Sequence, residues 1–427
     1  MTSFASTLYR GLCPAIAALA PLLGRTSAKW RRGLNGRNGL MDRLINAADI
    51  VSGGIWFHAT SVGEYEQARP VIASLREQGH GPIAVTLYSP SGLDFARVNP
   101  AGDFHDYLPF DTPANMTALF NAWRPRCLVF AKYDSWPNQV AAATAAGVPV
   151  IMISGALPEN SGRLHRLVRP LFRDVYNQFA CIGTGSTADQ QRFIENLGVT
   201  APTRVTGDTR AEQVIQRFER DRNGDVATAL QQWGEQRLVL GSTWPPDEQI
   251  WWDALPQLLH KFPGLNVVLV PHEPTTSRVR NLIQKSQDCR IPATTLTDYQ
   301  DHNDPARILV VDRVGVLAEI YGVASIAYVG GGFTTGVHST LEPAVPALPI
   351  LFGPRISNAE EALTMVSNGG GKVVQSGRDI LNVVPGWLEE PDTAARAGRS
   401  ARLTVDTQIG ATDRSAAMIV DIINQRR

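Results

Sequence analysis

The sequence has little that would support a metal centre, a disulfide framework or a nucleic-acid-binding surface. Its 427 residues carry a formal net charge of +0, from 40 basic and 40 acidic side chains, so no global attraction to nucleic acid is expected. The four cysteines lack CxxC spacing, which argues against zinc and disulfides and is typical of a reducing cytoplasm. We therefore expect neither a metal nor another cofactor. The cysteines are Cys13, Cys127, Cys181 and Cys289.

A long uninterrupted apolar run is also missing. The segment from Leu8 to Leu23 is mostly apolar, but Arg10, Pro14 and Pro21 interrupt it, and it is shorter than the ~20 apolar residues of a membrane-spanning helix. No small-residue cleavage site follows, so a secretory signal peptide is disfavoured. A basic cluster comes next: Arg25, Lys29, Arg31, Arg32 and Arg37.

An apolar helix followed by basic side chains predicts contact with an anionic membrane surface, where each basic residue adds about 1 kcal/mol. The alternative is a first helix packed on its own domain with a solvated basic edge. The clustering of the basic residues directly after the apolar segment favours the membrane surface, because cytoplasmic flanks of such anchors are basic.

Short apolar runs that alternate with helical segments predict an α/β fold with parallel sheets. We expect two Rossmann-like doubly wound domains facing a cleft, with ligands beyond the carboxyl ends of the strands. The expected strands are 55–59, 83–87, 127–130, 148–153, 180–183 and 204–207, then 238–241, 267–270, 308–311, 326–329 and 349–352. The expected parts are a segment 1–40, domains 41–210 and 211–400, and a helical end 401–427.

A run of glycines follows the strand expected at 326–329. Glycine lets a backbone turn with positive φ and approach a ligand closely, and Ser339 or Thr340 can cap a helix after the turn. The N–H groups and the dipole there suit a phosphate, while Glu342 can accept hydrogen bonds from ribose hydroxyls. This predicts a nucleotide site; the alternative is an ordinary glycine-rich turn with a capping glutamate. The glycines are Gly330, Gly331, Gly332 and Gly336.

Three further strand ends in the second half carry groups that suit an anion. Four such ends of one parallel sheet favour a nucleotide site more strongly than any one of them, although capping and turn formation account for each separately. The residues are Ser242 and Thr243, Pro271 and His272, and Gly315, Val316 and Leu317.

Glu64 is the ionisable side chain that stands out in the first half. It follows a strand and the turn 61–63, which places it in the first turn of a helix. A carboxylate there can take a proton from a hydroxyl nucleophile; the alternative is a glutamate that serves only the helix dipole. Lys132 and Asp134 follow another strand and either line the cleft or pair with each other. We interpret His58 as a core histidine.

Taken together, these motifs resemble the 3-deoxy-D-manno-octulosonic acid (Kdo) transferases of lipopolysaccharide assembly. The resemblance runs from Leu8 to about residue 380, and its ordered motifs are far more specific than one glycine loop. It implies a metal-independent GT-B glycosyltransferase at the cytoplasmic face of the inner membrane. The acceptor would bind the first domain and CMP-Kdo the second, and a last helix would cross back. The motifs are 56–64, 136–138, 205–208, 241–243, 270–272, 330–343 and 351–354.

The resemblance also implies roles for single residues. Glu64 would be the general base that activates a hydroxyl of a lipid A precursor (lipid IVA) for inverting transfer of Kdo. Arg210 would stabilise charge on the phosphate or the Kdo carboxylate, and the turn at 242–243 would hold the phosphate. The implied CMP contacts are Pro271, His272, Gly315, Val316, Leu317, Ser339, Thr340, Leu341 and Glu342.

The chain departs from the family pattern at two places. Many members have Glu-Thr-Glu-Leu-Trp-Pro where residues 132–137 stand, so Lys132 replaces the first acid, and Asp134, which we expect to be a catalytic residue, replaces the second. Many also have arginine at the position of His272. Two other functions stay open. One is a GT-B enzyme with another donor, such as a UDP-sugar, and the other is a non-catalytic lipid- or nucleotide-binding relative.

Overall fold

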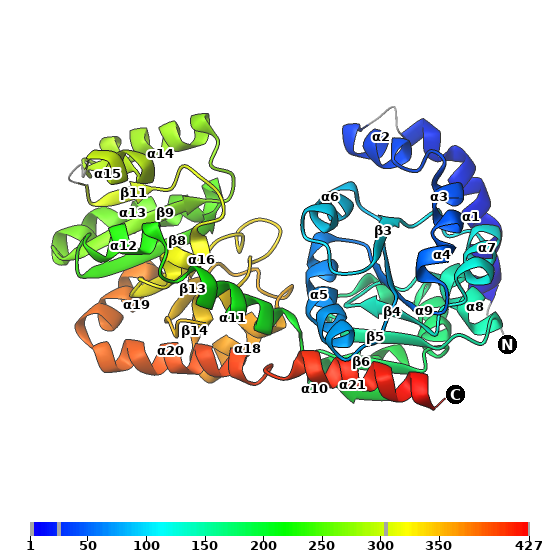
Figure 1. Cartoon of the computed structure of the whole chain (residues 1–427). Coiled ribbons are helices and arrows are strands. Elements are labelled where there is room, and N and C mark those ends of the chain that lie inside the picture. The colour runs from blue at the N-terminus through cyan, green and yellow to red at the C-terminus, as the bar shows by residue number, and fades with distance from the viewer. Residues whose placement is uncertain (1–3, 24–26, 303–305, 426–427) are drawn as a thin grey trace. The chain divides into compact units, whose positions relative to one another are not determined.

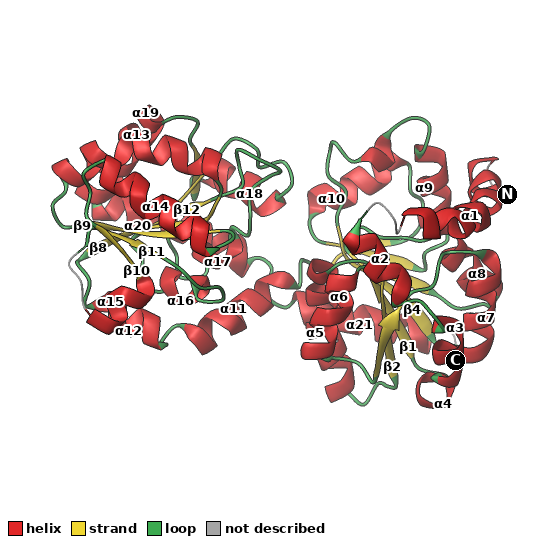
Figure 2. Cartoon of the chain, turned by 90° about the horizontal axis from the view of Figure 1, so that it is seen from above, coloured by secondary structure: helices red, strands yellow, loops and turns green. Residues whose placement is uncertain are grey.

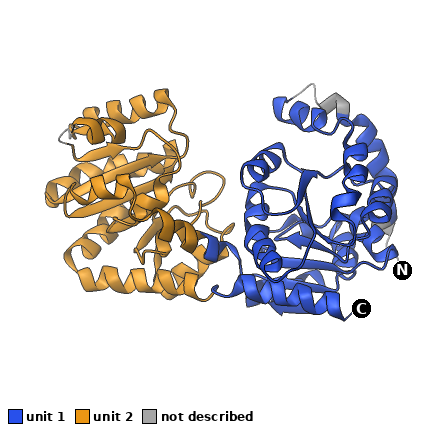
Figure 3. Cartoon of the chain, in the orientation of Figure 1, with its two compact units in different colours: residues 1–213, 408–427 blue, residues 214–407 orange. Residues whose placement is uncertain are grey.

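The computed structural model describes residues 4–23, 27–302 and 306–425, which form two compact units (Figure 3). Unit 1 comprises residues 1–213 and 408–427, and unit 2 comprises residues 214–407. The chain passes from the first unit to the second inside helix α11 (Arg210–Asp221) and returns after α20 (Pro391–Asp406). The sequence placed the divisions after residues 210 and 400.

Unit 1 is built on a seven-stranded parallel sheet in the order β3-β2-β1-β4-β5-β6-β7 (Figure 1). Its central strands are buried along their whole length, as expected for a sheet covered by helices on both faces. The strands are β1 Ile55–Ala59, β2 Ile83–Leu87, β3 Phe104–Tyr107, β4 Cys127–Ala131, β5 Val150–Gly155, β6 Cys181–Thr184 and β7 Thr203–Val205.

Helices surround this sheet (Figure 2), and the last helix of the chain packs against α5 with its apolar side chains in the unit 1 core. The helices are α1 Phe4–Leu23, α2 Ala28–Asn35, α3 Leu40–Asn46, α4 Ala48–Val51, α5 Val62–Glu77, α6 Pro90–Val98, α7 Pro113–Trp123, α8 Pro137–Ala145, η1 Gly162–Leu164, α9 Arg169–Tyr176, α10 Thr187–Gln191, η2 Arg192–Leu197 and α21 Ala411–Asn424.

Unit 2 repeats the architecture with a parallel sheet of seven strands in the order β10-β11-β9-β8-β12-β13-β14. The strands are β8 Gln236–Thr243, β9 Leu265–Pro271, β10 Ala293–Thr295, β11 Ile308–Val310, β12 Ile326–Val329, β13 Ile350–Phe352 and β14 Gly371–Val373. Its helices, besides α11 and α20, are α12 Asp225–Gln231, α13 Pro245–Lys261, α14 Thr276–Asp288, α15 Leu296–His302, α16 Leu317–Tyr321, α17 Leu341–Ala344, α18 Glu360–Asn368 and α19 Gly377–Glu389.

The predicted α/β class with two parallel sheets is confirmed, and every strand expected from the sequence is present. The sequence analysis missed β3, β10 and β14, which lie at sheet edges. In the part of the chain that the structure describes, no helix combines the length and apolar character needed to cross a membrane.

Candidate active site

Glu64 lies in the first turn of α5, directly beyond the carboxyl end of β1. Its Oε2 accepts hydrogen bonds from the backbone N–H of Thr60 at 2.5 Å and of Ser61 at 3.2 Å, while Ser61 Oγ accepts from the N–H of Glu64 at 3.4 Å. This reciprocal pair is a capping box. The side chain is only 5% exposed. Glu64 thus caps its own helix, and its role as a base stays a prediction.

The environment of Glu64 favours its protonated form. Burial, together with the negative charge of Asp134, raises the pKa of Glu64 to about 8, although the N–H groups of Thr60 and Ser61 and the charge of Lys132 act in the opposite direction. A carboxyl group with a pKa near the working pH can both take and return a proton, as a general base must.

The loop after β4 brings charge of both signs to the same sheet edge. Lys132 has a left-handed backbone with φ 64°, and its Nζ lies 4.7 Å from the centre of the Tyr133 ring. Asp134 accepts a hydrogen bond from Arg163 Nη2 at 3.4 Å. The α8 helix then begins at Pro137. The charge of Asp134 raises the pKa of Glu64, and the charge of Lys132 lowers it.

Arg210 is held by Asp208, a residue that the sequence analysis quoted only within a motif. The Nε and Nη2 atoms of Arg210 donate to Asp208 Oδ2 at 2.9 and 2.6 Å, and Gln67 Nε2 donates to Asp208 Oδ1 at 2.9 Å. Burial alone would raise the pKa of Asp208, but the neighbouring Arg210 outweighs it and the pKa falls to about 2. Asp208 therefore stays ionised and fixes the guanidinium.

His58 is a core residue, as interpreted. Its Nδ1 lies 2.9 Å from Thr86 Oγ1, its Nε2 lies 3.4 Å from Thr60 Oγ1, and burial lowers its pKa to about 3. The ring is therefore neutral, and it contacts the turn at Thr60.

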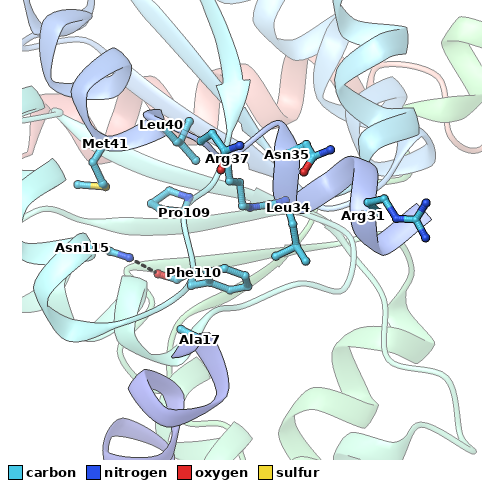
Figure 4. A pocket seen from close by; sticks show the side chains of 11 residues that line it. Ala17, Arg31, Leu34, Asn35, Arg37, Leu40, Met41, Pro109, Phe110 and Asn115 are labelled. Carbon is cyan, nitrogen blue, oxygen red and sulfur yellow. Dashed lines mark hydrogen bonds between the residues drawn. The ribbon is translucent and has the colours of Figure 1, made fainter. Parts of the chain in front are cut away.

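A cavity of about 560 Å³ lies between α2, the end of α1 and the loop after β3 (Figure 4). Leu34, Arg37 and Phe110 are among the side chains that line it, and Asn115 Nδ2 donates to the carbonyl of Phe110 at 2.9 Å. Sequence reasoning did not find this cavity, because its walls come from four separate segments without a shared motif.

In unit 2 the strands β11, β9, β8 and β12 are direct neighbours, so the four predicted strand ends do meet at one sheet edge. Ser242 adopts φ 52° at an irregularity between Gly241 and Thr243 in the pairing of β8 with β9. Thr243 Oγ1 donates to Glu248 Oε1 at 2.7 Å, and Glu248 also pairs with Arg278. The Thr243 hydroxyl is therefore already hydrogen-bonded within the protein, whereas Ser242 is half-exposed.

The glycine loop packs closely on protein. A Cβ at Gly330 would lie 2.3 Å from the carbonyl oxygen of Ser242, and a Cβ at Gly332 would lie 2.6 Å from Gly353 Cα. Gly331 has φ 93°, and its N–H donates to Asp247 Oδ2 at 3.0 Å. These glycines are therefore required first by the loop's own packing.

Three aromatic rings form a stack beside this loop. The His272 and His338 rings lie 4.3 Å apart at 9°, the Trp244 and His272 rings lie 4.8 Å apart, and Trp244 Nε1 donates to His338 Nε2 at 3.0 Å. Burial, with the charge of His272, lowers the pKa of His338. Of the three, only His272 was predicted, since nothing in the local sequence marks Trp244 or His338 as partners.

The predicted side-chain cap on α17 is wrong. Thr340 occupies the N-cap position with φ −87° and ψ −12°, a helical backbone from which its hydroxyl cannot reach the first turn, and Thr340 Oγ1 is buried without a partner. Ser339 is exposed, Glu342 is in the first turn as predicted, and Glu342 lies 3.7 Å from Arg217.

The remaining predicted donor contacts differ in exposure. Pro271 is buried at the end of β9, whereas Gly315 is exposed with φ 89°. Val316 is the N-cap of the short helix α16, which begins at Leu317, and Leu341 is buried. No three His, Cys, Asp or Glu side chains within the described ranges are grouped to hold a metal ion. Independence from metal stays a prediction.

Two α/β units with parallel seven-stranded sheets define the GT-B class of glycosyltransferase folds. A glycosyltransferase from Rickettsia africae aligns with a TM-score of 0.58 and 10% identity, over 88% of this chain and 98% of that one. A UDP-GlcNAc 2-epimerase from Neisseria meningitidis aligns with a TM-score of 0.62 and 15% identity, over 87% and 100%. At these identities the likeness shows the fold alone.

Sequence comparisons relate this chain to one family of transferases. Residues 28–213 match the model of the 3-deoxy-D-manno-octulosonic-acid transferase (kdotransferase) family. The Kdo transferase of Haemophilus influenzae is 25% identical over 415 residues, 94% of each chain, and that of Chlamydophila psittaci is 28% identical over 350 residues, 80% of this chain and 78% of the relative. Residues 28–213 thus carry a domain that matches this family, the chain is similar to Kdo transferases over most of its length, and it is a transferase.

Proposed function

We propose that the protein transfers Kdo from CMP-Kdo to a sugar hydroxyl of a lipid A precursor, with inversion at the anomeric carbon. The observation that carries this proposal is Glu64, a buried carboxyl whose pKa is raised to about 8 at the end of a strand in the family domain. Its ionised form removes the proton of the attacking hydroxyl. As that oxygen bonds to the Kdo anomeric carbon, the bond to the CMP phosphate oxygen breaks and CMP leaves.

Unit 2 would hold the donor. The half-exposed Ser242, the exposed His272 and the exposed turn at Gly315 offer hydroxyl, imidazole and N–H groups along one sheet edge, and Glu342 offers a carboxylate to ribose hydroxyls. Arg210, fixed by Asp208, would neutralise charge that develops on the phosphate or the Kdo carboxylate. No step in this scheme uses a metal.

The α1 helix would attach the enzyme to the cytoplasmic face of the inner membrane. Leu8, Leu12, Ile16 and Leu19 recur on one helical face and are 49%, 49%, 58% and 59% exposed. The basic residues of α2, including Arg31 and Arg32, are exposed nearby in sequence. Binding to vesicles should need anionic lipid and weaken in Ile16→Glu, whereas Ile409→Glu, at an exposed site in unit 1, should bind as wild type.

The direct test is Kdo transfer onto a tetraacylated lipid A precursor, with CMP-Kdo generated in situ and the product weighed by mass spectrometry. One or two added Kdo masses, lost in Glu64→Gln, are the expected result. If the wild type adds no Kdo and UDP stabilises it against heat better than CMP, the donor assignment is wrong. If no nucleotide binds, a non-catalytic relative is the better description.

A further inference from the structure

A second cavity, of about 310 Å³, lies beneath α2 in unit 1 and is called the α2 cavity here. Its walls are mostly apolar: Trp30, Leu34, Tyr88, Pro90 and Phe110 all line it. An apolar hollow of this kind, in a protein of otherwise mixed surface, is suited to hydrocarbon.

The charged groups at the α2 cavity are all positive. Lys29 and Arg37 line it, and no acidic side chain among the residues that the structure describes does. Arg37 donates to the carbonyls of Gly33, Tyr88 and Leu108 at 3.0, 2.9 and 3.0 Å, and no carboxylate of the described chain lies within salt-bridge distance of it. A guanidinium held in place by carbonyl oxygens keeps its full charge to offer an anionic ligand.

The α2 cavity reaches the turn that contacts the proposed base. Thr60 lines it, and the N–H of Thr60 is the group that donates to the Glu64 carboxylate at 2.5 Å. Tyr88, on the cavity wall, stacks on Trp136 with ring centres 4.9 Å apart. A ligand in the cavity therefore places its next atoms at the turn that carries Glu64.

The side of the cavity formed by α2 is partly exposed and follows α1 in the sequence. Trp30 of its wall is 41% exposed, and the preceding helix carries the apolar stripe that includes Ile16 and Leu19. A chain that leaves a membrane surface at α1 can thus enter the cavity past apolar side chains.

We propose that the α2 cavity binds one acyl chain of the anionic glycolipid acceptor, with an acceptor phosphate at Lys29 and Arg37, and so sets the specificity for acylated acceptors. This inference rests on the proposed function and adds a subsite to it. The acyl chain orients the acceptor so that its sugar hydroxyl faces Glu64.

Gly33 offers a clean way to fill the cavity. It lies within α2, lines the cavity, and a Cβ built on it would meet Arg37 Nη1 and Pro90 Cγ at 3.5 Å, which is ordinary contact. Because glycine is a poor helix former, Gly33→Leu removes a helix penalty while it fills the space. Gly386→Leu is the matched control: Gly386 is a helical glycine in unit 2 with open space at its Cβ position.

Initial rates would be measured with a tetraacylated acceptor and with its fully deacylated form. In Gly33→Leu the KM for the acylated acceptor should rise roughly tenfold or more, the size of effect that small volume changes make in an apolar pocket. The KM values for the deacylated acceptor and for CMP-Kdo should not change, and Gly386→Leu should match wild type. Gly33→Ala, a smaller filler, should show a smaller rise of the same kind if the larger variant fails to fold.

An unchanged KM for the acylated acceptor in a folded Gly33→Leu would overturn the inference, and so would an equal loss with both acceptors. A wild-type enzyme that transfers Kdo to neither acceptor would instead overturn the proposed function, so the two failures are distinguishable.

Discussion

The strand ends of the two units carry different kinds of chemical group. Around the buried Glu64 in unit 1, ionisable side chains act on one another: Asp134 raises the pKa of Glu64, Lys132 lowers it, and Arg210 holds Asp208 ionised. Around the glycine loop in unit 2, the buried carboxylate of Asp247 is bound by Gly331 N–H and Tyr328 OH. The groups left toward solvent there include a hydroxyl and an imidazole.

We infer from this difference that unit 1 carries the proton-transfer chemistry and that unit 2 binds the donor. Proton transfer needs a group whose charge changes near the working pH, and burial in unit 1 produces one. A nucleotide brings its own charge, so unit 2 needs fixed donors and close backbone packing instead. The comparison predicts that substitutions in unit 1 change rates and pH profiles, whereas substitutions in unit 2 change donor affinity.

The largest effect should come from Glu64→Gln. The rate of Kdo transfer should fall roughly 10²–10⁴-fold, the usual range for loss of a general base. The fold should persist, because the amide oxygen of glutamine can still accept from the N–H groups of Thr60 and Ser61. Single-turnover rates with thermal melting as a folding control measure this, and wild-type turnover in the variant would show that another group takes the proton.

The same substitution has a signature in stability. The folded-state pKa of Glu64, about 8, lies above its ordinary value of 4.5, so the protonated carboxyl favours folding. That contribution is complete below about pH 4.5 and is lost as the pH rises through about 8. As the pH rises from about 4.5 to about 8, the stability of Glu64→Gln should therefore fall less than that of wild type in denaturant melts. A parallel loss in both proteins would contradict the raised pKa.

The next effect should be confined to unit 2. In Gly330→Ala the new Cβ would meet the backbone of Ser242, so the loop must move, which costs roughly 1–3 kcal/mol of stability. CMP binding, measured by calorimetry, should weaken. Gly264→Ala is the control, because a Cβ at Gly264 meets nothing within 4 Å. If Gly330→Ala binds CMP normally, the glycine loop does not form the donor site.

A smaller effect tests the charges around Glu64. Asp134→Asn removes a negative charge that raises the pKa of Glu64, so the acid limb of kcat/KM against pH should move to lower pH. Burial, the largest cause, remains, and the limb should stay above the ordinary carboxyl value. Lys132→Met should move the limb the other way. Shifts of the two variants in the same direction would mean that the limb reports a different group.

The sequence predicted the interior of both sheets and missed three of their edges. Central strands such as Ile151 to Ile153 are continuous apolar runs, because helices cover both faces of the sheet. The missed strands are short and mixed: Phe-His-Asp-Tyr in β3, Ala-Thr-Thr in β10 and Gly-Lys-Val in β14. An edge strand needs less burial, so its composition does not distinguish it from a loop.

Site features that depend on neighbouring residues in the sequence were predicted, whereas features that depend on contacts between distant residues were missed. The position of Glu64 follows from Ser61-Val62-Gly63-Glu64, since capping and spacing act within one turn. The raised pKa of Glu64 depends on Asp134, and the fixed Arg210 depends on contacts with Asp208 that no short motif encodes. The failed cap at Thr340 shows the same limit, because burial of the hydroxyl is set by packing from elsewhere in unit 2.

The smallest expected effect comes from a substitution at the proposed donor site of unit 2. His272 is exposed and stacks on His338. In His272→Arg the guanidinium is charged and can bind a phosphate through two N–H groups, so CMP should bind several-fold more tightly. Calorimetry measures this. Because Glu64 lies in the other unit, the acid limb of the rate profile should not move. A shifted limb with unchanged CMP affinity would mean that groups of unit 2 take part in proton transfer. The division between reaction in unit 1 and binding in unit 2 would then fail.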